Sequence, residues 1–250
     1  MSVYPNRFAG TTVIVTGGGA GIGRATVERI AAEGGRVVAT DVLPERLEKL
    51  TSEVSGDILT VTGDVTEPDT IARVLAAAGD RIDGLANVAG IMDGFEPTAE
   101  ILDETWDRVL AVNLTAMMTL TRAVLPLMLA QGHGSIVNVG SEAGLRGSAA
   151  GTPYTVSKHA VNGFTLSTAF FYTPKGVRCN AVAPGPVATS IEAPFRSEWS
   201  AQRLGPLFQT NIPPVAQPEE LAAAIAWLLS DDASNVSGSI LRVDGGWAAI

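Results

Sequence analysis

The chain has 250 residues, enough for one large domain or two small ones, and a formal net charge of −9. With 46% hydrophobic and 17% charged residues, it can bury a sizeable core and lacks the composition of a disordered chain. The excess of carboxylates disfavours nucleic acids and anionic membrane surfaces as partners, because both select clustered Lys and Arg.

Cysteine and histidine are scarce. The single cysteine, Cys179, excludes an intrachain disulfide, and one thiol with two separated histidines does not make a usual zinc site, so we expect no metal. The N-terminus lacks the apolar core of a signal peptide, and the most apolar later stretch, residues 114–129, contains Arg122 and Pro126. These features predict a cytoplasmic protein that does not bind a membrane.

Short β-branched runs alternate with helical patterns along the chain. The expected strands are 12–16, 36–40, 58–61, 84–87, 135–139, 177–182 and 239–243, and the expected helices are 24–33, 44–54, 68–78, 103–130, 154–173 and 218–229. Parallel strands joined by short connections need crossover helices, so the pattern predicts a doubly wound, Rossmann-type α/β fold. We expect a seven-stranded parallel sheet with helices on both faces, in a single domain over residues 1–250.

One segment interrupts this rhythm. Residues 184–214 contain several prolines, show no clean period and are longer than an ordinary connection. Such a segment is typical of a lid or a disordered loop. We expect a substrate lid over residues 186–214.

The first strand runs into a glycine-rich turn that opens a helix. Glycines adopt positive φ and let the backbone approach a pyrophosphate, while the helix N-terminus attracts anions. The spacing Gly17, Gly21, Gly23 differs from the Gly-x-Gly-x-x-Gly of the standard fingerprint. Because strand and helix flank the turn correctly, we interpret it as a dinucleotide site rather than a plain flexible turn. The expected contacts are Gly17, Gly19, Gly21, Ile22 and Gly23.

Acidic residues end the next two strands. Asp41 closes the second strand, where a carboxylate can accept hydrogen bonds from the adenosine ribose and repel a 2′-phosphate. This favours NAD(H) over NADP(H), although an Asp here is also typical of a helix cap. Asp64, at the end of the third strand, and Val65 are expected to border the adenine.

Tyr154 and Lys158 are four residues apart, so they share one face of a predicted helix. A phenol with a pKa of about 10 is a poor base at neutral pH, but a nearby ammonium stabilises the phenolate and lowers that pKa. Tyr154 could then exchange a proton with an alcohol or carbonyl oxygen. The spacing alone is also typical of a surface pair, so its meaning depends on its setting.

Several further segments resemble, in their order and over essentially the whole chain, the classical short-chain dehydrogenase/reductase family. Residues 16–23 resemble its cofactor loop, and residues 87–90 resemble its Asn-Asn-Ala-Gly segment, with Val88 in place of the second Asn. Residues 180–185 are similar to the segment that faces the nicotinamide, and residues 244–247 to the C-terminal Asp-Gly signature. The positions of the family's catalytic residues are held by Asn113, Ser141, Tyr154 and Lys158.

The resemblance implies a role for each catalytic residue. Tyr154 would be the general acid/base, and Ser141 would hydrogen-bond the reacting oxygen of the substrate. Lys158 would lower the tyrosine pKa and hold the nicotinamide ribose, while Asn113 would hold a water that connects Lys158 to solvent. The implied cofactor contacts also include Asn87, Ala89, Gly90, Pro184, Gly185, Val187 and Thr189. In the family the corresponding helices form a dimer interface within a tetramer, so the resemblance implies a homotetramer, with a dimer as the alternative, and the long apolar helices fit this.

Apolar side chains dominate the lid and the loop after the fourth strand, which favours a hydrophobic secondary alcohol or ketone as the substrate. The expected substrate contacts are Met92, Phe95, Ala143 and Phe195. Arg196 and Arg203 leave an acidic group on the substrate open.

Two alternatives stay open. A 3-oxoacyl-carrier-protein reductase is also similar in sequence, but such enzymes commonly use NADPH, which Asp41 disfavours and for which Arg24 and Arg46 are the nearby basic candidates. A non-catalytic NAD-sensing binding module would keep the same scaffold, and the intact catalytic set speaks against it.

Overall fold

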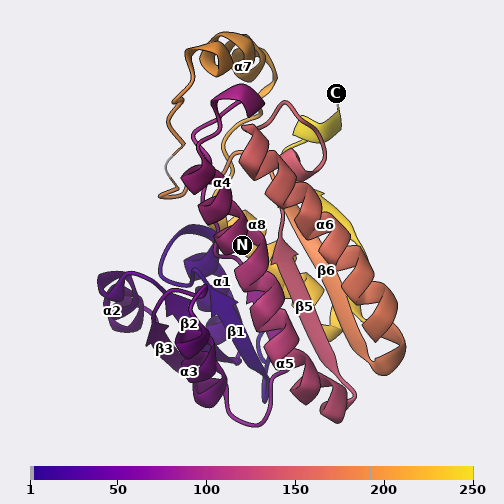
Figure 1. Ribbon diagram of the computed structural model, residues 1–250. Helices are drawn as coiled ribbons and strands as arrows, with labels where there is room; N and C mark the ends of the chain where they lie inside the picture. The colour runs from indigo at the N-terminus through magenta and orange to yellow at the C-terminus, as the bar shows by residue number, and fades with distance from the viewer. Residues whose placement is uncertain (1–2, 192, 250) are drawn as a thin grey trace.

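A single parallel sheet organises the molecule. The computed structural model describes residues 3–191 and 193–249. Seven strands pair in the order β3-β2-β1-β4-β5-β6-β7, and every pairing is parallel (Figure 1). The strands are β1 (Thr12–Thr16), β2 (Arg36–Asp41), β3 (Ile58–Thr62), β4 (Gly84–Asn87), β5 (Gly134–Val139), β6 (Val177–Pro184) and β7 (Ile240–Val243). This confirms the predicted fold class.

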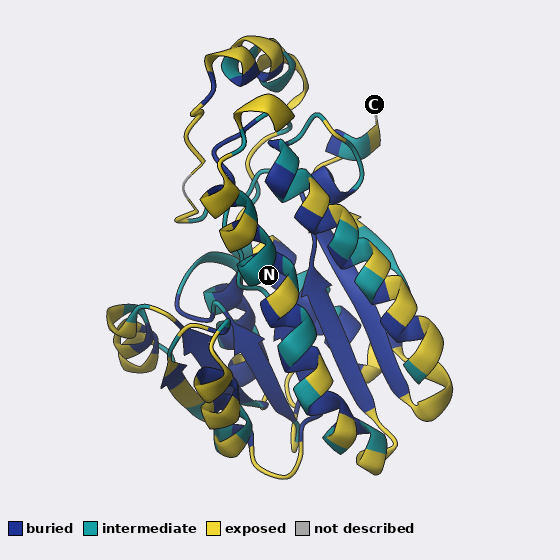
Figure 2. Ribbon diagram, viewed as in Figure 1, coloured by how far each residue is buried: buried dark blue, intermediate teal, exposed yellow. Residues whose placement is uncertain are grey.

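Helices connect the strands and cover both faces of the sheet. They are α1 (Gly21–Ala32), α2 (Pro44–Glu53), α3 (Pro68–Ala78), α4 (Asp103–Leu110), α5 (Met117–Gln131), α6 (Thr152–Tyr172), α7 (Glu198–Asn211) and α8 (Pro218–Leu229). One buried cluster joins α1, α2 and α8 to the sheet, and a second joins α3, α5 and α6 to its other face. The central strands β1, β4, β5 and β6 are buried along their whole length (Figure 2), as expected for strands covered on both faces.

The expected helix over residues 103–130 is one continuous helix with an irregular centre. Residues Ala111–Ala116, between α4 and α5, form a π-helical segment. The whole helix Asp103–Gln131 is long and apolar enough, by length and composition, to cross a membrane, but core helices of soluble proteins pass the same test. The π-helical segment places Asn113 inward, where it is fully buried.

The segment expected to be a lid leaves the sheet after β6 and contains α7, which lies beyond the carboxyl ends of the strands (Figure 1). Its two ends meet at a parallel bridge between Val187 and Ala216. The Ala188 N–H donates to the Ala216 carbonyl at 2.9 Å, and the Ala216 N–H donates to the Pro186 carbonyl at 3.0 Å. The lid is therefore a closed excursion of the chain with a 14-residue helix in it.

Candidate active site

The glycine turn after β1 forms an open cradle at the start of α1. Gly17 has a φ of +65°, and a Cβ on Gly23 would lie 2.0 Å from the Gly17 carbonyl oxygen, so only glycine fits there. The N-cap of α1, Ala20, provides no side-chain hydrogen bond to the first turn. The N-terminal N–H groups of α1 are thus available to an anion, as a pyrophosphate site requires.

The predicted ribose carboxylate, Asp41, lies against this cradle. Its Oδ2 accepts a hydrogen bond of 3.1 Å from the Gly19 N–H, and its Oδ1 accepts one of 3.1 Å from the Leu43 N–H. Arg46 lies beside it, with Nη1 at 4.0 Å from Asp41 Oδ1. The Arg46 Nη2 also donates to Ser190 Oγ of the lid at 3.4 Å. An acidic and a basic side chain therefore meet at the expected ribose position.

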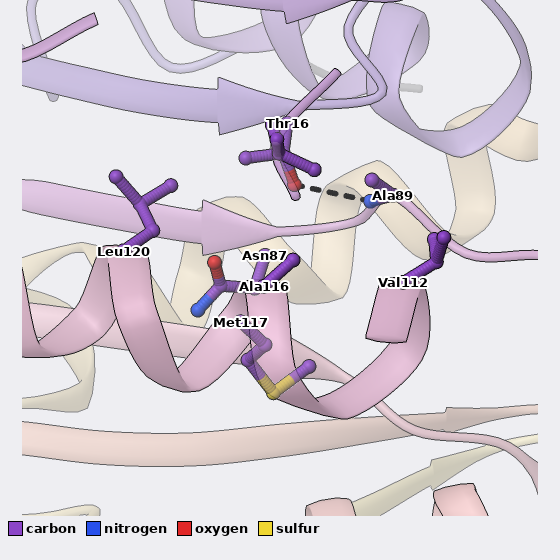
Figure 3. Close-up of a pocket in the computed structure, with 8 residues that line it drawn as sticks. Thr16, Asn87, Ala89, Val112, Ala116, Met117 and Leu120 are labelled. Carbon is purple, nitrogen blue, oxygen red and sulfur yellow. Dashed lines mark hydrogen bonds between the residues drawn. The ribbon is translucent and has the colours of Figure 1, made fainter. Parts of the chain in front are cut away.

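The strand ends next to the turn enclose a small cavity of about 10 Å³ (Figure 3). Thr16 Oγ1 accepts hydrogen bonds from the N–H groups of Val88 at 2.9 Å and Ala89 at 3.1 Å, which ties β1 to the turn after β4. The cavity includes three of the predicted cofactor contacts, namely Val65, Asn87 and Ala89. Asp64 is exposed, and its Oδ1 accepts hydrogen bonds from both the N–H and the hydroxyl of Thr66.

Of the predicted contacts downstream of β6, Thr189 packs against the glycine turn. Pro184 is the last residue of β6, and a Cβ on Gly185 would lie 2.9 Å from the Asp244 carbonyl oxygen. A Cβ on Gly21 would lie 3.0 Å from Thr189 Cγ2. Thr189 and the cofactor loop therefore pack together although they are far apart in sequence.

The structure brings Ser141, Tyr154 and Lys158 together at the carboxyl ends of β5 and β6. The Ser141 side chain lies close enough to the Tyr154 phenol to lower its pKa. Lys158 Nζ lies 5.4 Å from the centroid of the Tyr154 ring and donates a hydrogen bond of 2.8 Å to the Val139 carbonyl. The three predicted catalytic side chains thus form one group.

Burial determines the ionisation of this group. Burial raises the pKa of Tyr154 to about 12, the neighbouring Ser141 side chain opposes this rise, and the charge of Asp93 adds to it. Burial also lowers the pKa of Lys158 to about 8. The direction for Tyr154 is opposite to the one expected from a neighbouring ammonium, because loss of water around the phenolate is the largest influence on its pKa.

Three hydrogen bonds, to Ile91 and Ser157, hold the Asn113 side chain. Its Oδ1 accepts a hydrogen bond of 2.8 Å from the Ile91 N–H, and its Nδ2 donates to the Ile91 carbonyl at 3.0 Å and to Ser157 Oγ at 3.2 Å. A Cβ on Gly90 would lie 3.3 Å from Asn113 Oδ1 and 3.6 Å from Lys158 Nζ. Both polar groups therefore face the same glycine.

Four aromatic rings form a wall on the lid side of the site, which we name the aromatic wall: Phe95, Phe195, Phe208 and Trp247. The rings of Phe95 and Phe195 stack with their centroids 4.3 Å apart. The centroid of Phe208 lies 5.8 Å from that of Phe95 and 5.9 Å from that of Trp247. Of the other predicted substrate contacts, Ala143 is buried and donates its N–H to Ser141 Oγ, and Met92 is half-buried.

Next to this aromatic wall lies a pocket of about 280 Å³. Its lining joins the loop after β5, α7 and the C-terminal segment, through Arg146, Ser148, Leu207, Phe208, Asn211 and Trp247. Arg146 and Trp247 were not among the predicted substrate contacts. The Trp in the C-terminal signature is the one sequence signal that could have suggested them.

Comparison with known proteins supports this architecture along the whole chain. The family model described as short chain dehydrogenase matches residues 11–199. A short-chain dehydrogenase/reductase of Talaromyces verruculosus, cdmF, is 39% identical over 251 residues, covering 95% of this chain and 97% of that protein. The 3beta-hydroxysteroid dehydrogenase 2 of Eggerthella lenta is 37% identical over 253 residues, covering 97% and 96%.

Solved structures agree. Levodione reductase superposes with a TM-score of 0.88 at 34% identity, covering 97% of this chain and 99% of that chain. A putative NAD(P)-dependent gluconate 5-dehydrogenase from Beutenbergia cavernae, with bound NADP at low occupancy, gives a TM-score of 0.86 at 36% identity, covering 99% and 100%. The chain therefore belongs to the short-chain dehydrogenase family, whose members are oxidoreductases that use a nicotinamide cofactor and act on small molecules.

Proposed function

We propose that the protein is an NAD(H)-dependent oxidoreductase that interconverts a secondary alcohol and a ketone on a largely apolar substrate. The observation that carries the proposal is the group formed by Ser141, Tyr154 and Lys158, which lies at the same edge of the sheet as the glycine turn. In a doubly wound sheet, this edge is where ligands bind.

The residues of the cradle fit a dinucleotide. Gly17 and Gly23 leave room for close approach to the backbone, the first turn of α1 is open to an anion, and Thr189 packs over Gly21. A bound nicotinamide would exchange a hydride with the substrate carbon. The fit supports a dinucleotide.

The chain's own residues would move the proton. A phenol whose pKa is raised to about 12 stays protonated at neutral pH, so Tyr154 can donate its proton to a ketone oxygen that gains negative charge. Ser141, which lies beside Tyr154, would hold the same oxygen. Lys158, with its pKa near 8, is suited to exchange a proton around neutral pH, and it would stabilise the phenolate left on Tyr154.

The choice between cofactors rests on Asp41. Its carboxylate, held by the Gly19 N–H, would face the adenosine ribose and repel a 2′-phosphate, which supports NAD(H). Arg46 at 4.0 Å offers a charge of the opposite sign. We rank the carboxylate above the cation because Asp41 is buried, whereas Arg46 is more exposed and shared with Ser190.

The substrate proposal rests on the aromatic wall of Phe95, Phe195, Phe208 and Trp247. An apolar ring system that carries a ketone or hydroxyl oxygen would fill such a site. Levodione reductase and a 3beta-hydroxysteroid dehydrogenase, both similar to this chain, are named for substrates of this kind. A homotetramer and a cytoplasmic location stay predictions.

The test is a panel of levodione, 3-ketosteroids, gluconate and short acyclic ketones, each with NADH and with NADPH for reduction, or with the oxidised cofactor for alcohols. We expect turnover of an apolar cyclic ketone with NADH. Tyr154→Phe should lower this turnover by about 1,000-fold or more and leave the NADH affinity nearly unchanged. Equal turnover by Tyr154→Phe would overturn the proposed mechanism, and preference for gluconate would overturn the apolar substrate.

A further inference from the structure

A buried carboxylate lies at the N-terminus of the helix that carries Tyr154. Asp93, in the turn after β4, is only 1% exposed. Its Oδ2 accepts a hydrogen bond of 2.9 Å from the Tyr154 N–H, and its Oδ1 accepts one of 2.9 Å from the Phe95 N–H. In the described part of the chain, its hydrogen-bond partners are thus backbone N–H groups.

These contacts are those of a helix cap supplied from a distant loop. The first N–H groups of a helix have no partner inside it, and a side chain at the N-cap normally accepts from the third residue. The N-cap of α6 is Gly151, which has no side chain, and Tyr154 is the third residue of α6. A Cβ on Gly151 would lie 2.5 Å from Asp93 Oδ2. The glycine therefore leaves room for the Asp93 carboxylate, which takes the place of an N-cap side chain.

The residues next to Asp93 connect this cap to the lid. Gly94 has a φ of +70° and Phe95 a φ of +59°, a conformation that aromatic residues rarely adopt. The turn directs the Phe95 ring onto Phe195 of the lid, at 4.3 Å between centroids. The Arg196 N–H donates to the Gly94 carbonyl at 3.0 Å. Ring stacking and a backbone hydrogen bond thus join the lid to this turn.

Glu96 completes the connection. Its carbonyl accepts a hydrogen bond of 2.8 Å from the Thr152 N–H, in the first turn of α6. Its carboxylate accepts from the Leu102 N–H and the Thr105 hydroxyl, both at 3.2 Å, and lies 3.5 Å from Arg196 Nη1. Residues 93–96, which we name the connecting turn, therefore contact α6 at both ends and the lid in between.

We propose that Asp93 is a positioning residue for Tyr154, and that the connecting turn couples docking of the lid to the placement of the Tyr154 phenol. The role in catalysis rests on the proposed function, whereas the cap itself does not. A strained turn persists when its surroundings hold it in place, and here the lid is one of the holding elements. When the lid is docked, the turn presses Asp93 onto the α6 N-terminus and fixes the backbone from which the phenol extends.

The cap can be tested without a substrate, by hydrogen–deuterium exchange of peptides from the full-length protein. We expect Asp93→Ala to speed exchange in the peptide over residues 151–156 at least tenfold (~10-fold, the loss of one capping bond) while peptides from the C-terminal half of α6 change little. Asp93→Asn keeps one acceptor oxygen and should give a smaller effect. Asp80→Asn, an exposed Asp after α3, is the matched control. Uniform change along α6, or none at residues 151–156, would overturn the cap.

Kinetics test the consequence for Tyr154. With the panel ketone that the wild type turns over fastest, Asp93→Ala should lower kcat by roughly 10- to 100-fold, because small displacements of a catalytic group have large effects. The NADH dissociation constant should stay within about twofold of the wild type, and Asp93→Asn should recover part of the loss. Parallel losses of kcat and NADH affinity would show a general structural role and overturn the positioning role.

The lid coupling is tested from the other side. Phe195→Ala leaves the connecting turn and α6 unaltered in sequence, and we expect it to speed exchange over residues 151–156 as well. Trp199→Ala, at an exposed lid residue, is the matched control and should leave that peptide unchanged. Unchanged exchange in Phe195→Ala would overturn the coupling and leave the cap standing. If no panel ketone is turned over, the proposed function fails while the exchange measurements still decide the cap.

Discussion

Arg146 lies over the ring of Trp247, with its guanidinium carbon 4.6 Å from the ring centroid. The Nε of the same arginine is 2.5 Å from Oε1 of Glu142, whose side chain is 1% exposed. Burial raises the pKa of Glu142, and the charge of Arg146 opposes this rise. Arg146 thus contacts Trp247 of the aromatic wall and neutralises the buried Glu142 carboxylate next to Ser141.

Replacing this arginine should leave Glu142 buried without its cation. We expect Arg146→Met to lower the free energy of unfolding by about 3 kcal/mol at pH 8. The loss should shrink as the pH falls towards 5, because Glu142, with its raised pKa in the folded state, can then take up a proton and become neutral. Urea unfolding at both pH values measures this, with Arg108→Met on the exposed side of α4 as control. An equal loss at both pH values would contradict the explanation.

We expect the buried charge of Lys158 to lower the free energy of unfolding, although turnover requires this residue. Its pKa falls from 10.5 to about 8 on burial, so the folded state disfavours its charged form. This penalty is fully present below pH 8 and disappears as the pH rises towards 10.5. Lys158→Met should therefore raise the free energy of unfolding of the cofactor-free protein at pH 7, by at most about 3 kcal/mol, and abolish turnover. Thermal unfolding would count against this account if the variant were the less stable protein.

The pair of Asp41 and Arg46 should determine the cofactor. Asp41→Ser removes the carboxylate that would repel a 2′-phosphate and frees Arg46, so we expect NADPH to bind at least tenfold more tightly (~10-fold for one removed like charge). Adding Arg46→Gln should reverse most of this gain. Fluorescence titration with NADH and NADPH measures both affinities. If wild type already binds NADPH more tightly, the preference proposed from Asp41 is wrong.

The outer face of α6 should be a subunit contact. Phe170 and Phe171, 76% and 61% exposed, lie near the C-terminal end of α6, and exposed residues follow the outer side of this helix (Figure 2). Apolar side chains this exposed are typical of interfaces. We expect Phe170→Glu to convert the wild-type oligomer to a smaller species in size-exclusion chromatography with light scattering. Ala72→Glu adds the same charge on the exposed face of α3 and should not. A monomeric wild type would contradict the homotetramer.

The sheet and most helices could be predicted because their signals are local. The strands are β-branched runs, and Pro44, Pro68 and Pro218 mark the first helical residues of α2, α3 and α8. The helix α7 was missed because Pro206 lies inside it and its apolar residues show no clean period. Its position is set by contacts of Phe195 and Phe208 with rings from other parts of the chain.

The site was predictable in its composition but not in its energetics. Ser141, Tyr154 and Lys158 lie together as expected, whereas the direction of the Tyr154 pKa depends on burial, which spacing does not reveal. Asp93 was missed for a similar reason. Its cap spans 61 residues of sequence, and the local sign is only a glycine at the N-cap of a helix.

The bridge between Val187 and Ala216 separates the lid from the sheet that carries the site. Because the ends of the lid meet there, residues can be added or removed inside the lid without moving a strand. Each doubling of loop length raises the free-energy cost of closing the loop by only about 0.6 kcal/mol. The length and sequence of the lid can therefore change while the sheet stays the same. A lid from a relative, grafted between these two residues, would be a route to a new substrate on an unchanged catalytic frame.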